Sequence, residues 1–209
     1  DLARIVRGLG EDPGVRVVVL RAEGRGFNAG VDIKEMQATE GHHALIGANR
    51  GCYEAFAAVY ECKVPVVAAV NGVGVGIGLT LLLHCDLVLM SDTARIKVPF
   101  ISLGVTTEAS ASVMMPTVMG WQRAAEVLFT EPWITADQAV ADGIALRAVP
   151  HDRLMEDATA LARHVGALPL EPVMATKQLM LAGRLDAVRA ARLRETAAFE
   201  VLVSAMLNS

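Results

Sequence analysis

Cysteine is scarce in this chain, and its thiols are poorly placed for a disulfide framework. The 209 residues contain only Cys52, Cys62 and Cys85, and no two of them form a CxxC pair. Few, unevenly spaced thiols are typical of proteins from a reducing compartment. Residue 1 is Asp, and no basic segment followed by an apolar run opens the sequence, so no secretory signal is visible. We therefore expect a cytoplasmic protein.

An excess of positive charge is also missing. The chain has 19 Lys and Arg against 23 Asp and Glu, which gives a net charge of −4. Nucleic acids and anionic membrane surfaces attract proteins through basic patches, so we expect neither as a partner. The hydrophobic content is 53%, which is enough to bury a core as one domain with an appendage.

Charged residues are absent from Val64 to Leu83, a stretch long enough to cross a membrane as a helix. Pro65, Asn71 and the alternating glycines after it disfavour one continuous helix there. A buried strand, a glycine turn and a buried helix explain the same residues better.

Strand-like and helix-like segments alternate along the first part of the chain. We expect strands at 15–20, 64–70, 86–91, 96–99 and 145–149, and helices at 2–9, 44–61, 79–84, 108–119, 122–129 and 136–142, with a further helical start at 32–36. Such alternation indicates right-handed βαβ units and an α/β fold. Everything after residue 150 is helix-forming, with helices expected at 152–165, 172–181 and 185–206. This boundary divides the chain into a core of residues 1–150 and a helical region of residues 151–209.

Two glycine-rich segments each follow an expected strand and precede an expected helix. They are residues 24–32, GRGFNAGVD, and residues 71–78, NGVGVGIG. Neither contains GxGxxG or the GK[ST] of a P-loop, so nucleotide-phosphate binding of those kinds is unsupported. Unpaired backbone N–H groups at a helix start favour negative charge, and two such turns converging on one point would form an oxyanion hole. Taken singly, each segment is more readily interpreted as an ordinary tight turn.

Together these segments resemble the crotonase, or enoyl-CoA hydratase/isomerase, superfamily. Residues 27–34, FNAGVDIK, are similar to its FxAGxDxK segment, and residues 65–72 with 76–78 and Cys85-Asp86 match its second signature without a gap. Further similarity lies at 99–104, 134–139 and 143–145. The resemblance covers nearly the whole chain, but the family's opening strands and final stretch are missing. We interpret the chain as part of a longer protein.

The resemblance implies a crotonase-type spiral of βαβ units with a C-terminal helical trimerisation region. It also implies an acyl-CoA thioester as substrate, with no other cofactor and no metal. The thioester carbonyl would accept hydrogen bonds from the backbone N–H groups of Val31 and Ile77; the family usually has Gly at the second position. The residues expected along the CoA ester are Ala29, Gly30, Asp32, Ile33 and Gly76. Asp32 is at least as readily a cap or turn residue.

The two glutamates that hydratases of this family use are absent, since Thr80 and Phe100 stand in their places. Neither side chain exchanges protons near neutral pH, so we expect the hydratase mechanism to be disabled. Glu108, eight residues after Phe100, resembles the single catalytic carboxylate of the family's enoyl-CoA isomerases. We expect Glu108 to ionise readily at the start of a helix, and an enclosing acyl chain to raise its basicity by desolvation. A carboxylate there can also simply stabilise the helix.

Three functional hypotheses follow. The first, which we favour, is an enzyme that shifts a double bond in an enoyl-CoA through Glu108. The second is another crotonase reaction, hydratase-like or on a bulky CoA ester, because residues 26–41 with 48–52 resemble actinobacterial members that act on ring-derived CoA esters. The third is an acyl-CoA binder without catalysis, suggested by the missing glutamates.

Other polar residues have simpler interpretations. The five histidines show no metal-ligand spacing, and we interpret each as a surface or packed residue. Arg123 and Glu126, three residues apart, suit a surface pair. The helices after His151 carry more apolar positions than a short tail can bury, which predicts a homotrimer or a dimer of trimers.

Overall fold

The computed structural model describes residues 1–30 and 42–207 and contains two four-stranded sheets. The first sheet is parallel and has the order β1-β3-β5-β8. Its strands are β1 (Val18–Arg21), β3 (Val66–Val70), β5 (Leu87–Ser91) and β8 (Arg147–Val149). The second sheet has the order β2-β4-β6-β7, and its last pair is antiparallel. Its strands are β2 (Gly26–Asn28), β4 (Val73–Val75), β6 (Arg95–Lys97) and β7 (Ile134–Thr135).

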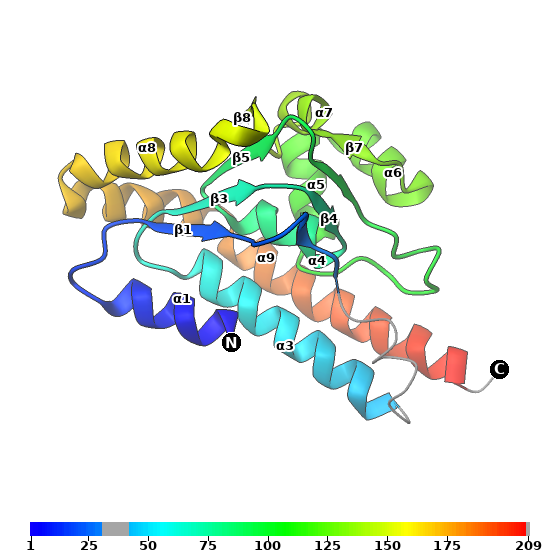
Figure 1. The fold of residues 1–209 in the computed structure, drawn as a ribbon. Coiled ribbons are helices and arrows are strands. Elements are labelled where there is room, and N and C mark those ends of the chain that lie inside the picture. The colour runs from blue at the N-terminus through cyan, green and yellow to red at the C-terminus, as the bar shows by residue number, and fades with distance from the viewer. Residues whose placement is uncertain (31–41, 208–209) are drawn as a thin grey trace.

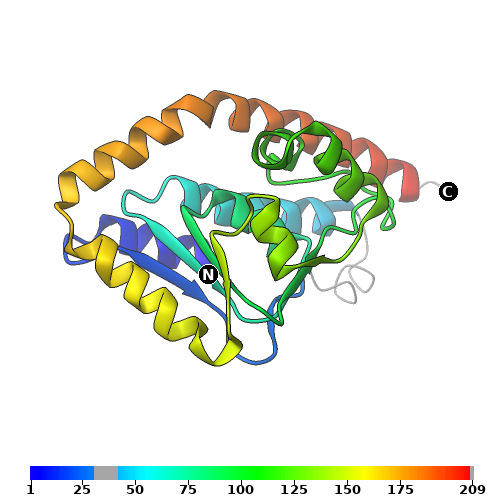
Figure 2. The same cartoon turned by 90° about the horizontal axis from the view of Figure 1, so that it is seen from above.

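Helices cover both faces of the first sheet, which makes the fold α/β as expected (Figures 1 and 2). The helices are α1 (Leu2–Glu11), α3 (His42–Tyr60), α4 (Ile77–Thr80), η1 (Leu81–His84), α5 (Ala111–Met119), α6 (Trp121–Thr130), α7 (Ala136–Ala141), η2 (His151–Arg153), α8 (Leu154–Ala167) and α9 (Leu170–Leu207). α8 lies on the opposite side of the sheet from α1 and α3 (Figure 1). The division of the chain at residue 150 stays a prediction.

Strand β3 forms the centre of the core because both of its faces are buried. All five of its residues are apolar and inaccessible to solvent. Val66 packs in a cluster with residues of α1 and α3, whereas Val67 and Ala69 pack on the other face with Leu154 and Ala158 of α8. A continuous apolar run of this kind is what a parallel strand between two helical layers requires.

The uncharged stretch from Val64 to Leu83 is divided among β3, β4, α4 and η1. The expected strand and helix are present, and the expected glycine turn contains a second short strand, β4. In the described part of the chain, no helix combines the length and the apolar character needed to cross a membrane.

Helix α9 is one continuous helix of 38 residues, so the prediction of two separate helices at 172–181 and 185–206 is wrong. The expected break contains Gly183, whose α-carbon faces open space. A single Gly costs a helix about 1 kcal/mol relative to Ala, which is too little to end it without Pro or a cap. The helix runs along one side of the molecule (Figure 2), and it therefore carries residues from the base of the sheet to the region near α5.

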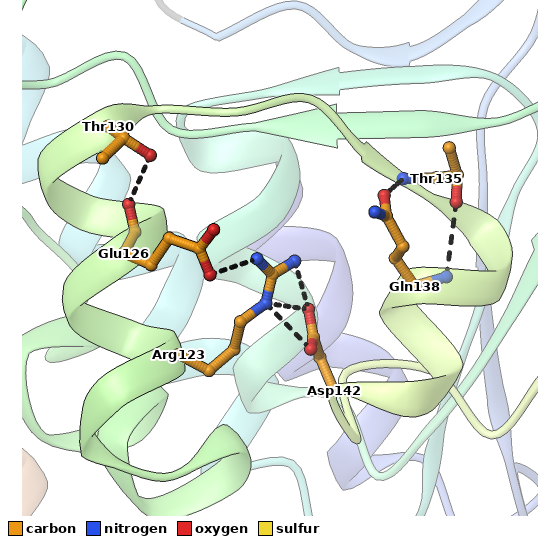
Figure 3. A network of polar contacts seen from close by, with 6 residues as sticks. All are labelled: Arg123, Glu126, Thr130, Thr135, Gln138 and Asp142. Carbon is orange, nitrogen blue, oxygen red and sulfur yellow. Dashed lines mark hydrogen bonds and ion pairs between the residues drawn. The ribbon is translucent and has the colours of Figure 1, made fainter.

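A polar network joins α6 to α7 (Figure 3). Arg123 donates from Nε to both carboxylate oxygens of Asp142 at 3.0 Å and from a terminal nitrogen to Glu126 at 2.9 Å. The expected Arg123–Glu126 pair is therefore confirmed, with Asp142 as a second partner. Thr135 and Gln138 form a capping box at the start of α7.

Candidate active site

The two glycine-rich segments lie against each other because β2 and β4 are parallel neighbours, with Gly26 opposite Val73 and Asn28 opposite Gly74. Their backbones approach so closely that a side chain would not fit. A Cβ on Gly78 would lie 2.3 Å from the carbonyl oxygen of Asn28, and one on Gly72 would lie 2.1 Å from that of Arg25. The two segments therefore lie side by side as far as Gly30, and their convergence on a thioester oxygen stays a prediction.

The first segment turns at Gly30, where φ is +90° and the N–H donates to the side-chain oxygen of Asn28 at 2.8 Å. Positive φ explains why Gly occupies this position. Ala29 is exposed beside it. Val31, Asp32 and Ile33, the expected N–H donor and two CoA-lining residues, lie outside the described residues.

The second segment presents a helix start at Gly76 and Ile77. Gly76 precedes α4 with φ of +56°, and its N–H donates to the carbonyl of Lys97 at 2.9 Å. Ile77 is the first helical residue, so its N–H has no acceptor inside the helix. The Ile77 side chain packs against the apolar cluster of α1, β1 and α3. The Ile77 N–H expected to face the thioester is therefore at a helix start, and its role stays a prediction.

Glu108 does not stand at a helix start, and that expectation is wrong. Helix α5 begins only at Ala111, with no acidic residue in its first turn. Ala109 and Ser110 both have φ of 59°, a left-handed conformation that a right-handed helix excludes. Stabilisation of a helix start therefore does not explain this carboxylate.

The surroundings of Glu108 make its proton available near neutral pH. Burial, and secondarily the negative charge of Glu195, raise its pKa to about 7, although the Thr80 hydroxyl opposes this. The Thr80 Oγ lies 3.5 Å from the Glu108 carboxylate and 3.3 Å from the carbonyl of Gly76. The expectation that Glu108 ionises readily is wrong. A pKa near 7 suits a group that must both take and return a proton.

Thr80 and Phe100 are both buried, and Phe100 belongs to the main apolar cluster. Thr80 offers Glu108 a hydroxyl where a hydratase would offer a second carboxylate. Of the three positions where the family can carry an acid–base residue, 80, 100 and 108, only Glu108 is therefore a carboxylate.

Sequence reasoning missed the residues of α3 and α9 that surround Glu108. Burial first, and then the charge of Glu108, raise the pKa of the Cys52 thiol to about 12. Burial also raises the pKa of Tyr53 to about 12, with smaller contributions that include Glu195 and Glu108. Both groups are therefore neutral near pH 7. No local pattern marks Glu195, whose partners lie more than eighty residues away along the chain.

His84 is packed, as expected, and holds the residue that follows Glu108. Its Nε2 lies 2.7 Å from the carbonyl oxygen of Ala109, and its ring centroid lies 5.6 Å from that of Phe56 and 5.3 Å from that of Tyr60. Burial lowers its pKa to about 4. The ring is neutral near pH 7, and because a carbonyl only accepts, Nε2 carries the proton.

Comparisons with known proteins agree with this geometry. The sequence model of the Enoyl-CoA hydratase/isomerase family matches residues 1–205. Two relatives, from Rhodococcus jostii and Mycobacterium tuberculosis, are each named "(7aS)-7a-methyl-1,5-dioxo-2,3,5,6,7,7a-hexahydro-1H-indene-carboxyl-CoA hydrolase". The first is 41% identical over 85% of this chain and 68% of its own length, and the second is 43% identical over 86% and 72%.

A putative enoyl-CoA hydratase from Thermus thermophilus is 35% identical over 87% of this chain and 72% of its own length. Among solved structures, Pseudomonas aeruginosa OdaA superposes with a TM-score of 0.88 at 34% identity, covering 97% of this chain and 81% of its own. The match to the family model extends over the glycine segments and Glu108. The chain belongs to the enoyl-CoA hydratase/isomerase family, the crotonase superfamily that its motifs resemble.

Proposed function

We propose that this chain hydrolyses a ring-derived CoA ester, with Glu108 as its single general base. The observation that carries the proposal is one partly buried carboxylate, its pKa raised to about 7, with Thr80 and Phe100 where hydratases have glutamates. The relatives from Rhodococcus jostii and Mycobacterium tuberculosis, named as hydrolases of a bicyclic dioxo CoA ester, supply the substrate class. This is the second of the three hypotheses made from the sequence, and these relatives favour it over the isomerase.

One carboxylate and an oxyanion hole suffice for hydrolysis of a ring carbon–carbon bond. Glu108 takes a proton from water while the water oxygen bonds to a ring ketone carbon attached to C2 of the thioester. The bond between that carbon and C2 then breaks, and its electron pair remains on C2 as the thioester enolate. Glu108 returns its proton to C2, which leaves a ring-opened carboxylic acid still joined to CoA. A base that donates and accepts in turn is most effective with a pKa near the working pH.

In this proposal the backbone N–H groups of Val31 and Ile77 hold the enolate oxygen. Charge develops there only when the ring bond breaks, so these donors stabilise the transition state more than the substrate. Ala29, Gly30, Asp32, Ile33 and Gly76 line the CoA ester. Cleavage at the thioester itself would not use the enolate, and it would release free CoA thiol.

The test is turnover of a bicyclic dioxo acyl-CoA, followed by mass spectrometry. The expected product gains the mass of one water and keeps its CoA, whereas release of CoA thiol would contradict the carbon–carbon step. Because Glu108 must be ionised, kcat/KM should rise with pH and level off above about 7. Glu108→Gln should lower kcat by roughly 10²–10⁴-fold with similar substrate affinity. Glu200→Gln, on exposed α9 surface, is the matched control and should leave turnover unchanged.

A double-bond shift in an enoyl-CoA is the second candidate, because it too needs one base and an enolate. The absence of a second carboxylate at Thr80 and Phe100 favours it over hydration. Conversion of 3-enoyl-CoA to 2-enoyl-CoA faster than hydrolysis of any dioxo ring ester would make it the better assignment. Binding of CoA esters without turnover of either substrate would instead favour the non-catalytic binder.

We also propose that the chain acts as a cytoplasmic homotrimer or dimer of trimers. Helix α9 keeps large apolar side chains exposed, and Leu179 and Leu193 are 76% and 73% accessible. Such side chains on one long helix are typical of a surface that another subunit covers. Light scattering that shows a monomer at micromolar concentration would refute the assembly.

A further inference from the structure

Glu195 is a carboxylate of α9 that lies almost entirely inside the molecule, with 4% of its surface exposed. One oxygen accepts the N–H of Ser110 at 2.7 Å, and the other accepts the N–H and the hydroxyl of Ser112 at 2.9 and 2.5 Å. Acidic side chains are rarely buried unless they are paired. All three donors belong to the short segment that directly follows Glu108.

One hydrogen bond of its own closes that segment, from the N–H of Ala111 to the carbonyl of Glu108 at 2.9 Å, but its dihedral angles need support from other elements. Ala109 and Ser110 are both left-handed with φ of 59°, and neither is Gly. Each such residue costs on the order of 1 kcal/mol or more and persists only where the surroundings fix it. The carbonyl of Ala109 is fixed by His84 at 2.7 Å, and the Ser110 hydroxyl donates to the carbonyl of Val188 at 2.7 Å. Glu195 accepts the N–H of Ser110 in the turn and that of Ser112 in the first turn of α5.

We propose that Glu195 is a positioning residue, which holds residues 109–112 in this strained turn so that the Glu108 carboxylate stays beside Thr80. The inference rests on the proposed role of Glu108 as the base. It adds a requirement that family motifs do not contain, namely a buried acid on the C-terminal helix. Misplacement of a catalytic group by about 1 Å can cost roughly 100-fold in rate, so such a hold has a measurable effect.

Glu195 also acts on Glu108 through its charge, because two nearby carboxylates disfavour double ionisation. Burial raises the pKa of Glu195 itself, although its hydrogen bonds to Ser112 and Ser110 and the charge of Arg194 oppose this. Among the residues that the structure describes, the titratable and charged groups around the pair are Cys52 and Tyr53 from α3, His84 from η1, and Arg192 and Arg194 from α9. The Arg192 guanidinium lies 4.8 Å from the centre of the Tyr53 ring.

The first experiment measures the stability of the turn and the titration of Glu108 in the absence of substrate. In Glu195→Gln the side-chain amide nitrogen must face one of the two N–H donors that the carboxylate accepted, so the turn loses a hydrogen bond and the site loses a charge. We expect faster hydrogen exchange at the amides of Ser110 and Ser112. We also expect the Glu108 carboxyl, followed by carbon-13 NMR of labelled glutamate, to titrate at lower pH than in the wild type. Glu108→Gln identifies the Glu108 signal, and Glu200→Gln should change neither measurement.

The second experiment measures kcat, KM and their dependence on pH. Glu195→Gln should lower kcat by roughly 10- to 100-fold, change KM by less than about threefold, and move the acid limb of the pH profile downward. Ser112→Ala removes one donor without touching the charge. It should give a smaller loss of kcat with an unmoved acid limb, and it keeps the test open if Glu195→Gln folds poorly.

The two proposals fail separately. A wild-type chain that turns over no CoA ester refutes the proposed function, while the exchange and titration data still decide the role of Glu195. Unchanged exchange at Ser110 and Ser112 with an unmoved Glu108 titration in Glu195→Gln would overturn the inference, even if the enzyme is active.

Discussion

Replacing Lys177 by Met should destabilise the fold far more than the same change at Lys63. The Lys177 ammonium group, on a side chain only 9% exposed, donates to Asp86 at 2.7 Å and to the carbonyl of Val64 at 3.0 Å. Asp86 also accepts the N–H of Val66 at 2.7 Å. This pair ties the first part of α9 to the N-terminal ends of β3 and β5. Lys63 and Glu11 form a pair of similar length, 2.6 Å, whose side chains are 49% and 67% exposed.

The two ion pairs differ mainly in burial, and this difference determines how much stability is lost when the lysine is replaced. Removing one partner of a buried pair costs about 3–5 kcal/mol, because a charge is left unpaired. Asp86 is 26% exposed and keeps the Val66 N–H, so water relieves part of this cost. Lys177→Met also leaves the Val64 carbonyl without its donor. We therefore expect a loss of about 2–4 kcal/mol for Lys177→Met and less than about 1 kcal/mol for Lys63→Met.

Equilibrium unfolding in urea measures both losses, and all variants are compared at one protein concentration because assembly also contributes to stability. Lys177→Met in an Asp86→Asn background should cost less than it does alone, since the carboxylate charge is already gone. Equal losses for Lys177→Met and Lys63→Met would show that burial does not control this interaction.

Two further predictions concern backbone packing and pH. Gly78→Ala should lower the free energy of unfolding by about 1–3 kcal/mol in thermal unfolding, since its Cβ would lie 2.3 Å from the Asn28 carbonyl oxygen. Gly183→Ala, in open space, should raise it by about 0.5–1 kcal/mol. An unchanged stability of Gly78→Ala would contradict the close approach of the two segments. Burial lowers the pKa of His84 from 6.5 to about 4, so its contribution to stability is complete above pH 6.5 and is lost as pH falls toward 4. His84→Gln cannot take up this proton, so its unfolding free energy should fall less than that of the wild type between pH 6.5 and 4. If the unfolding free energies of the two proteins fall equally over this interval, protonation of His84 is not the cause.

The large elements of the fold were predictable because they carry strong local patterns. Residues 64–70 were expected as a buried strand, and β3 occupies Val66–Val70. The second sheet was not predicted, because strands of two or three residues such as β2, β4 and β7 are too short to show an alternating pattern. The segments that β2 and β4 bring together were nevertheless identified from their motifs, since glycines at fixed positions reflect a backbone approach that a sequence can display.

The position of Glu108 was predicted from the family resemblance, but its conformation and its pKa were not. Left-handed φ is expected at Gly, and nothing in the letters of Ala109 and Ser110 marks it. Glu195 could not be found either, because its role arises from burial and from partners at Ser110 and Ser112, 85 and 83 residues earlier in the chain. Such contacts exist only once the fold has brought α9 across α5.

The long separation between Glu195 and the turn it holds affects when the site can form during synthesis. Chains fold from the N-terminus as they leave the ribosome, and contacts between residues far apart in the sequence form late because closing a long loop costs entropy. The sheets and α5 precede α9 in the chain, so they emerge while the strained turn at Ala109 and Ser110 still lacks its acceptor. The nascent chain therefore carries the residues of the site before it can hold them in place. Docking of α9 then fixes the turn that follows the base.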